Sequence, residues 1–207
     1  MKLTVNPNRM ELLRIKKRTI LAKKGHKLLK DKQEELMKMF ILTIKAAKKL
    51  RIELDAQLKE AQFAFLLARS KMTQEELHSA LAFPKGSITV DVSVQNVLNI
   101  KVPVFKISGR IDPYSYGFAH TGVYLDKAVG LVCGLWSSMI KLAEIETKVE
   151  LLAKEIEKTR RRVNALEYVL IPSLLETTRG ITIKLSEDER SNLTRLMRVK
   201  EIIESRY

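Results

Sequence analysis

The stretch that decides the fold runs from Leu12 to Ala68, where a mostly apolar or small residue recurs at every third or fourth position. Its members are Leu12, Ile15, Thr19, Ala22, His26, Leu29, Gln33, Leu36, Phe40, Thr43, Ala47, Leu50, Leu54, Gln57, Ala61, Ala64 and Ala68. Alternating steps of three and four keep such a stripe on one side of a helix, which buries it against a second helix. The stretch therefore predicts a long helix that packs along a partner helix.

A second stripe of the same spacing lies in the C-terminal half. It consists of Tyr124, Ala128, Leu131, Leu135, Ser138, Leu142, Ile145, Val149, Leu152, Ile156, Thr159, Val163, Leu166 and Leu170. Two such stripes predict a mainly α fold, a long antiparallel two-helix coiled coil in which the stripes form the seam. Polar seam residues such as Thr19, His26 and Gln33 weaken a coiled coil but set its register. Tolerated defects are the other interpretation of these positions.

The segment between the stripes has a different pattern. Residues 88–94 and 100–107 alternate and are rich in β-branched side chains, which predicts a β-hairpin. Pro103 restricts its strand to an edge, and a two-stranded hairpin allows this. The chain is therefore expected to divide into an N-terminal helix at 1–82, a hairpin and loop at 83–120, and a C-terminal helix at 121–207.

Local signals predict where the first helix begins and ends. Asn6 is expected to cap it, with Pro7 at the first helical position. The helix should run to about Leu81. A capping box that begins at Thr73 and includes Glu76 marks a place where the helix can break and restart.

The second helix is expected from about Thr121 to about Ile171, because Pro172 follows. Ser186 and Glu189 form a second capping-box pattern. The C-terminal residues therefore form either a separate last helix or a continuation of the one before it.

The charge is strongly basic and unevenly distributed. The net charge is +14, and residues 1–60 hold 17 Lys and Arg against 7 Asp and Glu. A helix of this charge is expected to meet an anionic partner, whether nucleic acid, a lipid surface or an acidic protein wall. Acidic residues interleaved along the second helix argue against nucleic acid. A membrane tether would need more exposed aromatic residues on the first helix.

No motif for catalysis or for a cofactor is present. The sequence lacks a glycine-rich phosphate loop, and His26, His78 and His120 have no metal-ligand spacing. Cys133 has no histidine near it in the sequence and is interpreted as a small core residue. The chain is therefore expected to be neither an enzyme nor a cofactor-binding protein.

Other features bear on location. A single cysteine excludes an internal disulfide framework and favours a reducing compartment. The longest uncharged apolar run, 128–140, has 13 residues, fewer than the roughly 20 that a spanning helix needs. Gly130 and Gly134 within it are interpreted as a point where two soluble helices approach closely. The sequence thus predicts a cytoplasmic chain without direct membrane insertion.

Three stretches of this sequence carry a family resemblance. The first is Val5-Asn6-Pro7-Asn8-Arg9-Met10-Glu11-Leu12-Leu13-Arg14, with Lys16-Lys17-Arg18 and Gly25-His26-Lys27-Leu28-Leu29-Lys30-Asp31-Lys32-Gln33-Glu34-Glu35-Leu36-Met37. The second is Glu155-Ile156-Glu157-Lys158-Thr159-Arg160-Arg161-Arg162-Val163-Asn164-Ala165-Leu166-Glu167-Tyr168 onward to Pro172, and the third is Glu189 to Lys200. All three are similar to one known family, the D subunits of the V-type and A-type rotary ATPases. These stretches cover both ends of the chain. Residues 83–120 are much less diagnostic.

The resemblance implies a central-stalk rotor, or axle. In that family both terminal helices enter the ring of catalytic and nucleotide-binding subunits, and the hairpin end lies beside the F subunit of the central stalk and above the socket subunit on the membrane rotor. It implies a non-catalytic chain at the cytoplasmic side of the membrane, peripheral to it, that couples ATP hydrolysis or synthesis to proton or sodium transport. The sequence does not choose between the two ions or the two directions.

Two sets of residues are expected to contact partners. The set expected to face the catalytic hexamer is basic: Arg9, Arg14, Lys16, Lys17, Arg18, Lys23, Lys24, Arg195, Arg198 and Lys200. The set expected to face the F subunit or the socket subunit is apolar: Val129, Leu131, Leu135, Trp136 and Met139.

Overall fold

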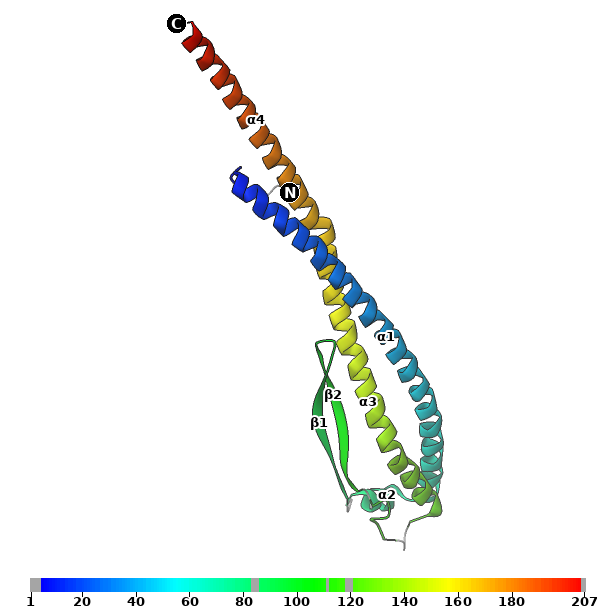
Figure 1. Cartoon of the computed structure of the whole chain (residues 1–207). Helices are drawn as coiled ribbons and strands as arrows, with labels where there is room; N and C mark the ends of the chain where they lie inside the picture. The colour runs from blue at the N-terminus through cyan, green and yellow to red at the C-terminus, as the bar shows by residue number, and fades with distance from the viewer. Residues whose placement is uncertain (1–4, 83–85, 111, 118–120, 206–207) are drawn as a thin grey trace. The chain divides into compact units, whose positions relative to one another are not determined.

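The computed structural model describes residues 5–82, 86–110, 112–117 and 121–205. Helices α1 (Arg9–Lys71) and α2 (Gln74–Leu81) precede the strands β1 (Ser87–Val97) and β2 (Ile100–Arg110). Helix α3 (Val123–Asn164), a π-helical segment η1 (Ala165–Leu170) and helix α4 (Ile171–Glu204) follow (Figure 1).

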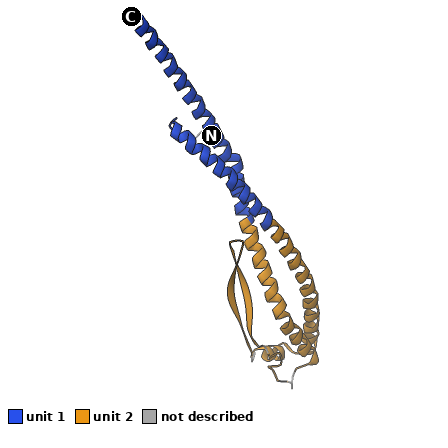
Figure 2. Ribbon diagram, in the orientation of Figure 1, with its two compact units in different colours: residues 1–35, 156–207 blue, residues 36–155 orange. Residues whose placement is uncertain are grey.

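The chain forms two compact units, coloured separately in Figure 2. Unit 1 contains residues 1–35 and 156–207, and unit 2 contains residues 36–155. Long helices from both halves of the chain contribute to each unit. The predicted helix pairing is therefore described separately for each.

In unit 1 the start of α1 packs antiparallel to α4 and the end of α3. Arg9 pairs with Glu189, and further along α1, Nε2 of His26 lies 3.3 Å from Oε2 of Glu167. The residue number of the partner falls from 189 to 167 as the residue number on α1 rises from 9 to 26, so the two segments run antiparallel. The core between the helices consists of Ile15, Leu174 and Ile181, with Leu12, Ala22, Leu170 and Leu185 packed against them.

In unit 2 the rest of α1 packs antiparallel to α3. Nη1 of Arg51 lies 3.0 Å from Oε1 of Glu146, and Nζ of Lys127 lies 3.5 Å from Oε1 of Glu60. The buried seam of this unit is rich in alanine: Ala61, Ala64, Ala68 and Ala128. Small seam side chains allow the two helix backbones to approach one another. The predicted coiled coil is thus confirmed.

Nearly all residues of the two predicted stripes are buried or half-buried. Gln57 and Tyr124 are exposed instead, and Leu125 replaces Tyr124 as a fully buried residue. The buried hydroxyls of Thr19, Ser173 and Thr177 bond within their own helices, and that of Thr19 donates to the carbonyl of Ile15 at 2.8 Å. A hydroxyl that bonds within its own helix does not by itself fix the register between helices.

The first helix begins two residues later than the sequence suggested. The carbonyl of Asn8 accepts the first helical bond, from the N–H of Leu12 at 2.9 Å, so Asn8 and not Asn6 is the capping residue. The break at the other end is confirmed. Thr73 Oγ1 accepts from the N–H of Glu76, whose carboxylate accepts from the N–H of Thr73 at 2.9 Å.

The hairpin is confirmed, and its strands are longer than expected. The pairing continues beyond the two alternating stretches to Val97 and Ile100, which flank a two-residue turn. Leu98 and Asn99 of that turn have φ values of 50° and 68°, as a type I′ turn requires. Pro103 pairs with Val94, and the sheet has only these two strands, so Pro103 does lie on an edge.

The second helix does not stop at Pro172. The segment η1 precedes it with wider hydrogen bonding, in which the N–H of Ile171 donates to the carbonyl of Leu166 five residues back. Proline lacks an N–H and its ring crowds the preceding turn, and a wider turn relieves that conflict. Ser186 lies inside α4, so the C-terminal residues continue the helix.

The close helix approach predicted at Gly130 and Gly134 is wrong. A Cβ added at Gly134 would meet nothing within 4 Å, and one at Gly130 would meet only the hydroxyl of Tyr114 at 4.0 Å. Both glycines therefore face away from the α1–α3 contact. The small residues that the helices do bury between them are alanines.

Candidate interaction surfaces

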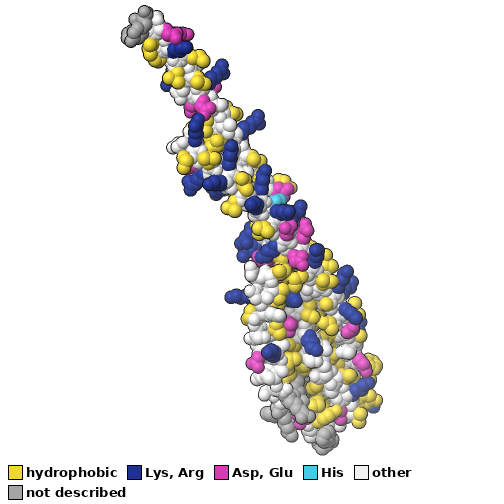
Figure 3. Space-filling view, viewed as in Figure 1, with side chains coloured by type: hydrophobic (Ala, Val, Ile, Leu, Met, Phe, Trp, Pro, Cys, Tyr) yellow, Lys and Arg dark blue, Asp and Glu magenta, His cyan; other side chains and the backbone are white. Residues whose placement is uncertain are grey.

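The ten basic residues expected to face the hexamer are all exposed and all belong to unit 1. Seven lie on α1 and three on α4. Residues Arg195, Arg198 and Lys200 lie on the part of α4 that extends past the start of α1 (Figure 1). Lys and Arg side chains line the visible face of this unit (Figure 3). We call these ten residues the basic surface.

Few of these cations are neutralised within the chain. Arg9 pairs with Glu189, Arg14 with Glu11 at 3.3 Å, and Lys200 with Glu204 at 3.5 Å. All three pairs are solvent-exposed and individually weak. Within the part of the chain that the structure describes, the other seven form no ion pair with a carboxylate. The basic surface thus keeps most of its positive charge for an external anionic group.

The end of α4 also exposes an apolar surface that the sequence prediction did not assign to a partner. Residues 186–204 are exposed throughout. Their apolar members are Leu193, Leu196, Met197, Val199, Ile202 and Ile203. The sequence signal was the helical spacing of these residues. An unpaired helix with this much exposed apolar area is typical of a surface that a partner covers.

The apolar set expected to face the F subunit or the socket subunit lies on α3 in unit 2. Trp136 is 42% exposed and Met139 40% exposed, whereas Val129 and Leu131 are half-buried. Leu135 is buried in the seam and is not available to a partner in this conformation. Trp136, one position further along, points out of the seam.

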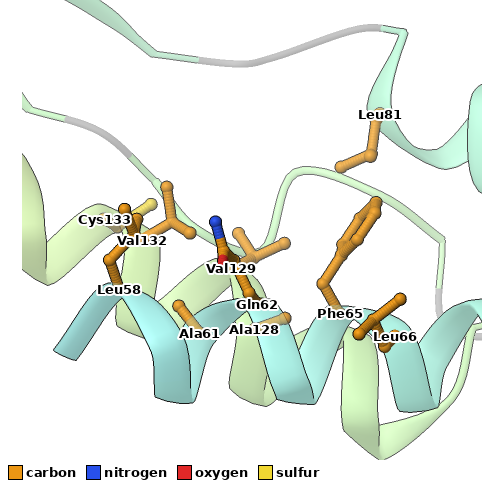
Figure 4. Close-up of a pocket in the computed structure, with 10 residues that line it drawn as sticks. All are labelled: Leu58, Ala61, Gln62, Phe65, Leu66, Leu81, Ala128, Val129, Val132 and Cys133. Atoms are coloured by element: carbon orange, nitrogen blue, oxygen red, sulfur yellow. The ribbon is translucent and has the colours of Figure 1, made fainter. Parts of the chain in front are cut away.

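An apolar groove lies next to this set, between α1, α2 and α3. Its volume is about 540 Å³, and it is lined by Leu58, Ala61, Gln62, Phe65, Leu66, Leu81, Ala128, Val129, Val132 and Cys133. Phe65 and Leu81 stand at one end of it, and Leu58, Val132 and Cys133 stand at the other (Figure 4). Burial raises the pKa of the Cys133 thiol, which disfavours the reactive thiolate.

Tyr116 joins the loop after the hairpin to the start of α3. Its hydroxyl donates to Oδ1 of Asp126 at 2.6 Å, and its ring packs with Ala68 and Leu125. Burial and the hydrogen bond to Asp126 raise the pKa of Tyr116, so it stays protonated and able to donate. This contact holds the loop against both long helices.

The helical stretch Val123–Glu204 contains an 18-residue window with a mean hydropathy of 1.5, of which 11% is buried within the structure. By length and composition alone this window could cross a membrane. The helix seam of a soluble protein passes the same test, so the absence of direct membrane insertion stays a prediction. Partner binding is the other way to cover such a surface.

Two of the three histidines belong to the described residues. His26 belongs to unit 1, His78 lies on α2 in unit 2, and His120 lies outside the described residues. Across residues 5–82, 86–110, 112–117 and 121–205, no three metal-ligating side chains come together.

These features define a class of protein: an antiparallel helical coiled coil with a β-hairpin, with exposed basic and apolar side chains on its surface. The sequence comparisons identify the family. A model of the family described as the D subunit of ATP synthase matches residues 11–201.

Proteins named as the D subunit of V-type ATP synthase are similar over nearly the whole chain. The one from Acetivibrio thermocellus is 51% identical, over 96% of this chain and 91% of its own length. Those from Clostridium botulinum (strain Langeland) and Fusobacterium nucleatum are each 48% identical, over 100% and 98% of this chain and 98% of their own lengths. This chain therefore belongs to the D-subunit family of the V-type ATP synthases.

Proposed function

We propose that this chain is the axle of a V-type rotary ATPase, and that it carries torque between ATP chemistry in a catalytic hexamer and ion movement in the membrane. The D subunit belongs to the central stalk of that complex, and the near full-length similarity to proteins of that name carries the proposal. The comparisons give no support to the alternatives of a nucleic-acid-binding or membrane-tethering coiled coil.

The basic surface of unit 1 suits the inner wall of the hexamer. An axle must turn past several similar subunits, so its contacts should be diffuse and not locked to one partner geometry. Exposed and largely unpaired Lys and Arg side chains provide an attraction that is long-ranged and weakened by salt. The exposed apolar side of α4 adds the area that keeps the helix seated.

The surface around Trp136 suits a second component of the stalk. Exposed tryptophan is enriched at the centres of protein interfaces. We assign this surface and the hairpin to contacts with the F subunit or with the socket subunit above the membrane rotor. The chain itself then has no catalytic role and lies on the cytoplasmic side, peripheral to the membrane.

Direct observation of rotation tests the axle role. A bead can be attached through a cysteine at Gln95, an exposed hairpin position, in a Cys133→Ser background, while the reconstituted hexamer is fixed to glass. ATP should drive one-directional rotation of the bead, and omission of ATP should stop it. Steady ATP hydrolysis by complexes that hold the labelled chain without any rotation would contradict the proposal.

A further inference from the structure

The two edges of the hairpin are protected differently. Strand β2 carries Lys101, Pro103 and Lys106, which are residues that natural edge strands use to prevent pairing with other chains. Strand β1 contains no lysine, arginine or proline over its 11 residues. Its pairing with β2 is also continuous, without a bulge. The outer edge of β1 therefore lacks the usual protection.

The turn determines which backbone groups of β1 face outward. A two-residue turn is closed by a hydrogen-bonded pair, here Val97 with Ile100, and bonded and non-bonded pairs alternate from there. The residues of β1 whose N–H and C=O then point away from β2 are Ile88, Val90, Val92, Val94 and Asn96. The backbone groups of these five residues can hydrogen-bond an added strand along the whole outer edge of β1.

The opposite edge supports this assignment and is already in use. The same alternation directs the N–H of Phe105 outward from β2, and that N–H donates to Oε2 of Glu144 on α3 at 3.2 Å. Pro103, at another outward position, has no N–H to offer. The edge of β2 thus faces α3, and the edge of β1 is the one open to pairing.

The side chains at the outward positions of β1 form an exposed apolar face. Val90, Val92 and Val94 are 44%, 60% and 64% exposed. Their cross-strand neighbours are Ile107, Phe105 and Pro103, so the apolar face spans both strands. The other face differs. It buries Ile100 and Val102 near the turn and is polar further along, where the Ser108 hydroxyl lies 3.2 Å from Oδ2 of Asp91.

We propose that the edge of β1 accepts an extended strand from another protein of the ATPase complex, which becomes the third strand of this sheet. A strand fits better than a helix. It uses the five outward backbone positions of β1, and its own β-branched apolar side chains extend the valine face. Beside Asp91 it carries a cationic or hydroxyl side chain. A two-stranded hairpin is marginal alone, and a third strand stabilises it. The proposal rests on membership of the complex and not on the axle role.

Amide hydrogen exchange with single-residue resolution tests this directly, on the isolated chain and on the assembled complex. The amides of Val90, Val92 and Val94 should exchange fast in the isolated chain and at least about tenfold more slowly in the complex. Those of Asp91 and Ser93, already bonded to β2, should change less. Slowing that does not alternate, or no slowing, would overturn the proposal.

A pair of proline variants tests the edge itself. Val92→Pro removes an outward N–H from β1, and Ile107→Pro removes one from β2, so each leaves the bonds between the strands in place. In complexes reconstituted with labelled chain, Val92→Pro should speed dissociation of the chain by about tenfold. Ile107→Pro should have a smaller effect, and Val92→Thr, which keeps the outward N–H, should also have a much smaller effect than Val92→Pro. Equal effects of the two prolines would count against a strand at β1.

A second copy of this chain is the competing occupant of the β1 edge. Sedimentation of the isolated chain over a range of concentrations should show a monomer, with no slowing of β1 exchange as concentration rises. A dimer whose β1 amides show the alternating protection would assign the edge to a second copy and overturn pairing with another protein of the complex. Because these measurements do not involve rotation, their failure leaves the axle role standing.

Discussion

The two units use the same antiparallel pairing but fill their seams with different side chains. Unit 1 buries large aliphatic residues such as Leu174 and Ile181 together with the hydroxyls of Thr19, Ser173 and Thr177. Unit 2 buries leucines as well, among them Leu36, Leu125 and Leu152, together with a run of alanines on α1 between residues 61 and 68. Among the described residues, the buried serines and threonines all belong to unit 1 and the buried alanines all belong to unit 2. Large aliphatic side chains therefore carry most of the buried apolar area in both seams, and the units differ in the small side chains between them.

The outer surfaces of the two units differ as well. Unit 1 exposes the basic surface and the apolar end of α4, whereas unit 2 exposes Trp136, the groove and the hairpin. The proposed function gives the two units different partners, and two partners require chemically different surfaces, because one surface optimised for both would discriminate between neither. Under that proposal the helix pair is a scaffold, and the residues that recognise partners lie outside its seam.

The largest expected effect is on the seam of unit 1. Leu174 is fully buried, so Leu174→Ala should lower the free energy of unfolding by about 3 kcal/mol through lost burial and a residual cavity. Hydrogen exchange should show residues 9–35 opening before residues 36–71. Leu175→Ala, at an exposed neighbouring position, is the control and should cost little. Equal opening of both halves of α1 would show that the units are not separate in stability.

Charge reversal distinguishes the surfaces of the two units. Changing Lys16, Lys17 and Lys23 to glutamate should weaken assembly with the hexamer by at least about tenfold at physiological salt, with a smaller difference at high salt. The control reverses Lys45, Lys48 and Lys49, which are exposed cations on the part of α1 in unit 2. If both triple variants assemble equally well in a titration of the hexamer, the basic surface is not the contact.

Sequence periodicity predicted the helix pair and most of its buried residues, because burial along a seam is a local consequence of 3–4 spacing. Features that depend on adjacent turns or on a packed helix could not be predicted from the spacing. The continuation of α4 through Pro172 requires the π-helical turn before it, and no simple spacing rule signals such a turn. The location of Gly130 and Gly134 away from the contact depends on which face α1 covers.

The candidate surfaces could be predicted only in part, because exposure also depends on which residues pack against each helix. All ten basic residues are exposed, as charged side chains are in almost any fold. Leu135 and Trp136 are adjacent in sequence, yet one is buried and the other is exposed. The stripe assigned Leu135 to the seam, but only the structure separates it from the residues that a partner can reach. The partners of these surfaces stay predictions.

Removal of Trp136 probes the unit 2 surface with a smaller expected effect. Trp136→Ala should weaken binding of the chain to its stalk partner by about tenfold while changing its own unfolding little, since the side chain is partly exposed. Tyr168→Ala, which truncates an exposed aromatic residue in unit 1, is the control. Binding should be measured by calorimetry with the purified F subunit. Unchanged affinity for the Trp136 variant would separate this surface from that partner.

The smallest effect concerns glycines within the helices, and it tests whether both units tolerate added side chains outside their seams. Gly180 in unit 1 and Gly134 in unit 2 both lie in helices, and a Cβ at either position would meet nothing within 4 Å. Alanine removes the conformational freedom that glycine has in the unfolded chain. Each substitution should therefore stabilise its unit by about 0.5–1 kcal/mol in urea unfolding.

Gly109→Ala in the hairpin is the opposing control. Its φ is +109° and a Cβ would lie 2.4 Å from the carbonyl oxygen of Ser87, so it should destabilise the hairpin. If Gly134→Ala instead destabilised the protein, another part of unit 2 would have to pack closely against α3 at that position. The helix contact of unit 2 would then include residues outside the alanine seam.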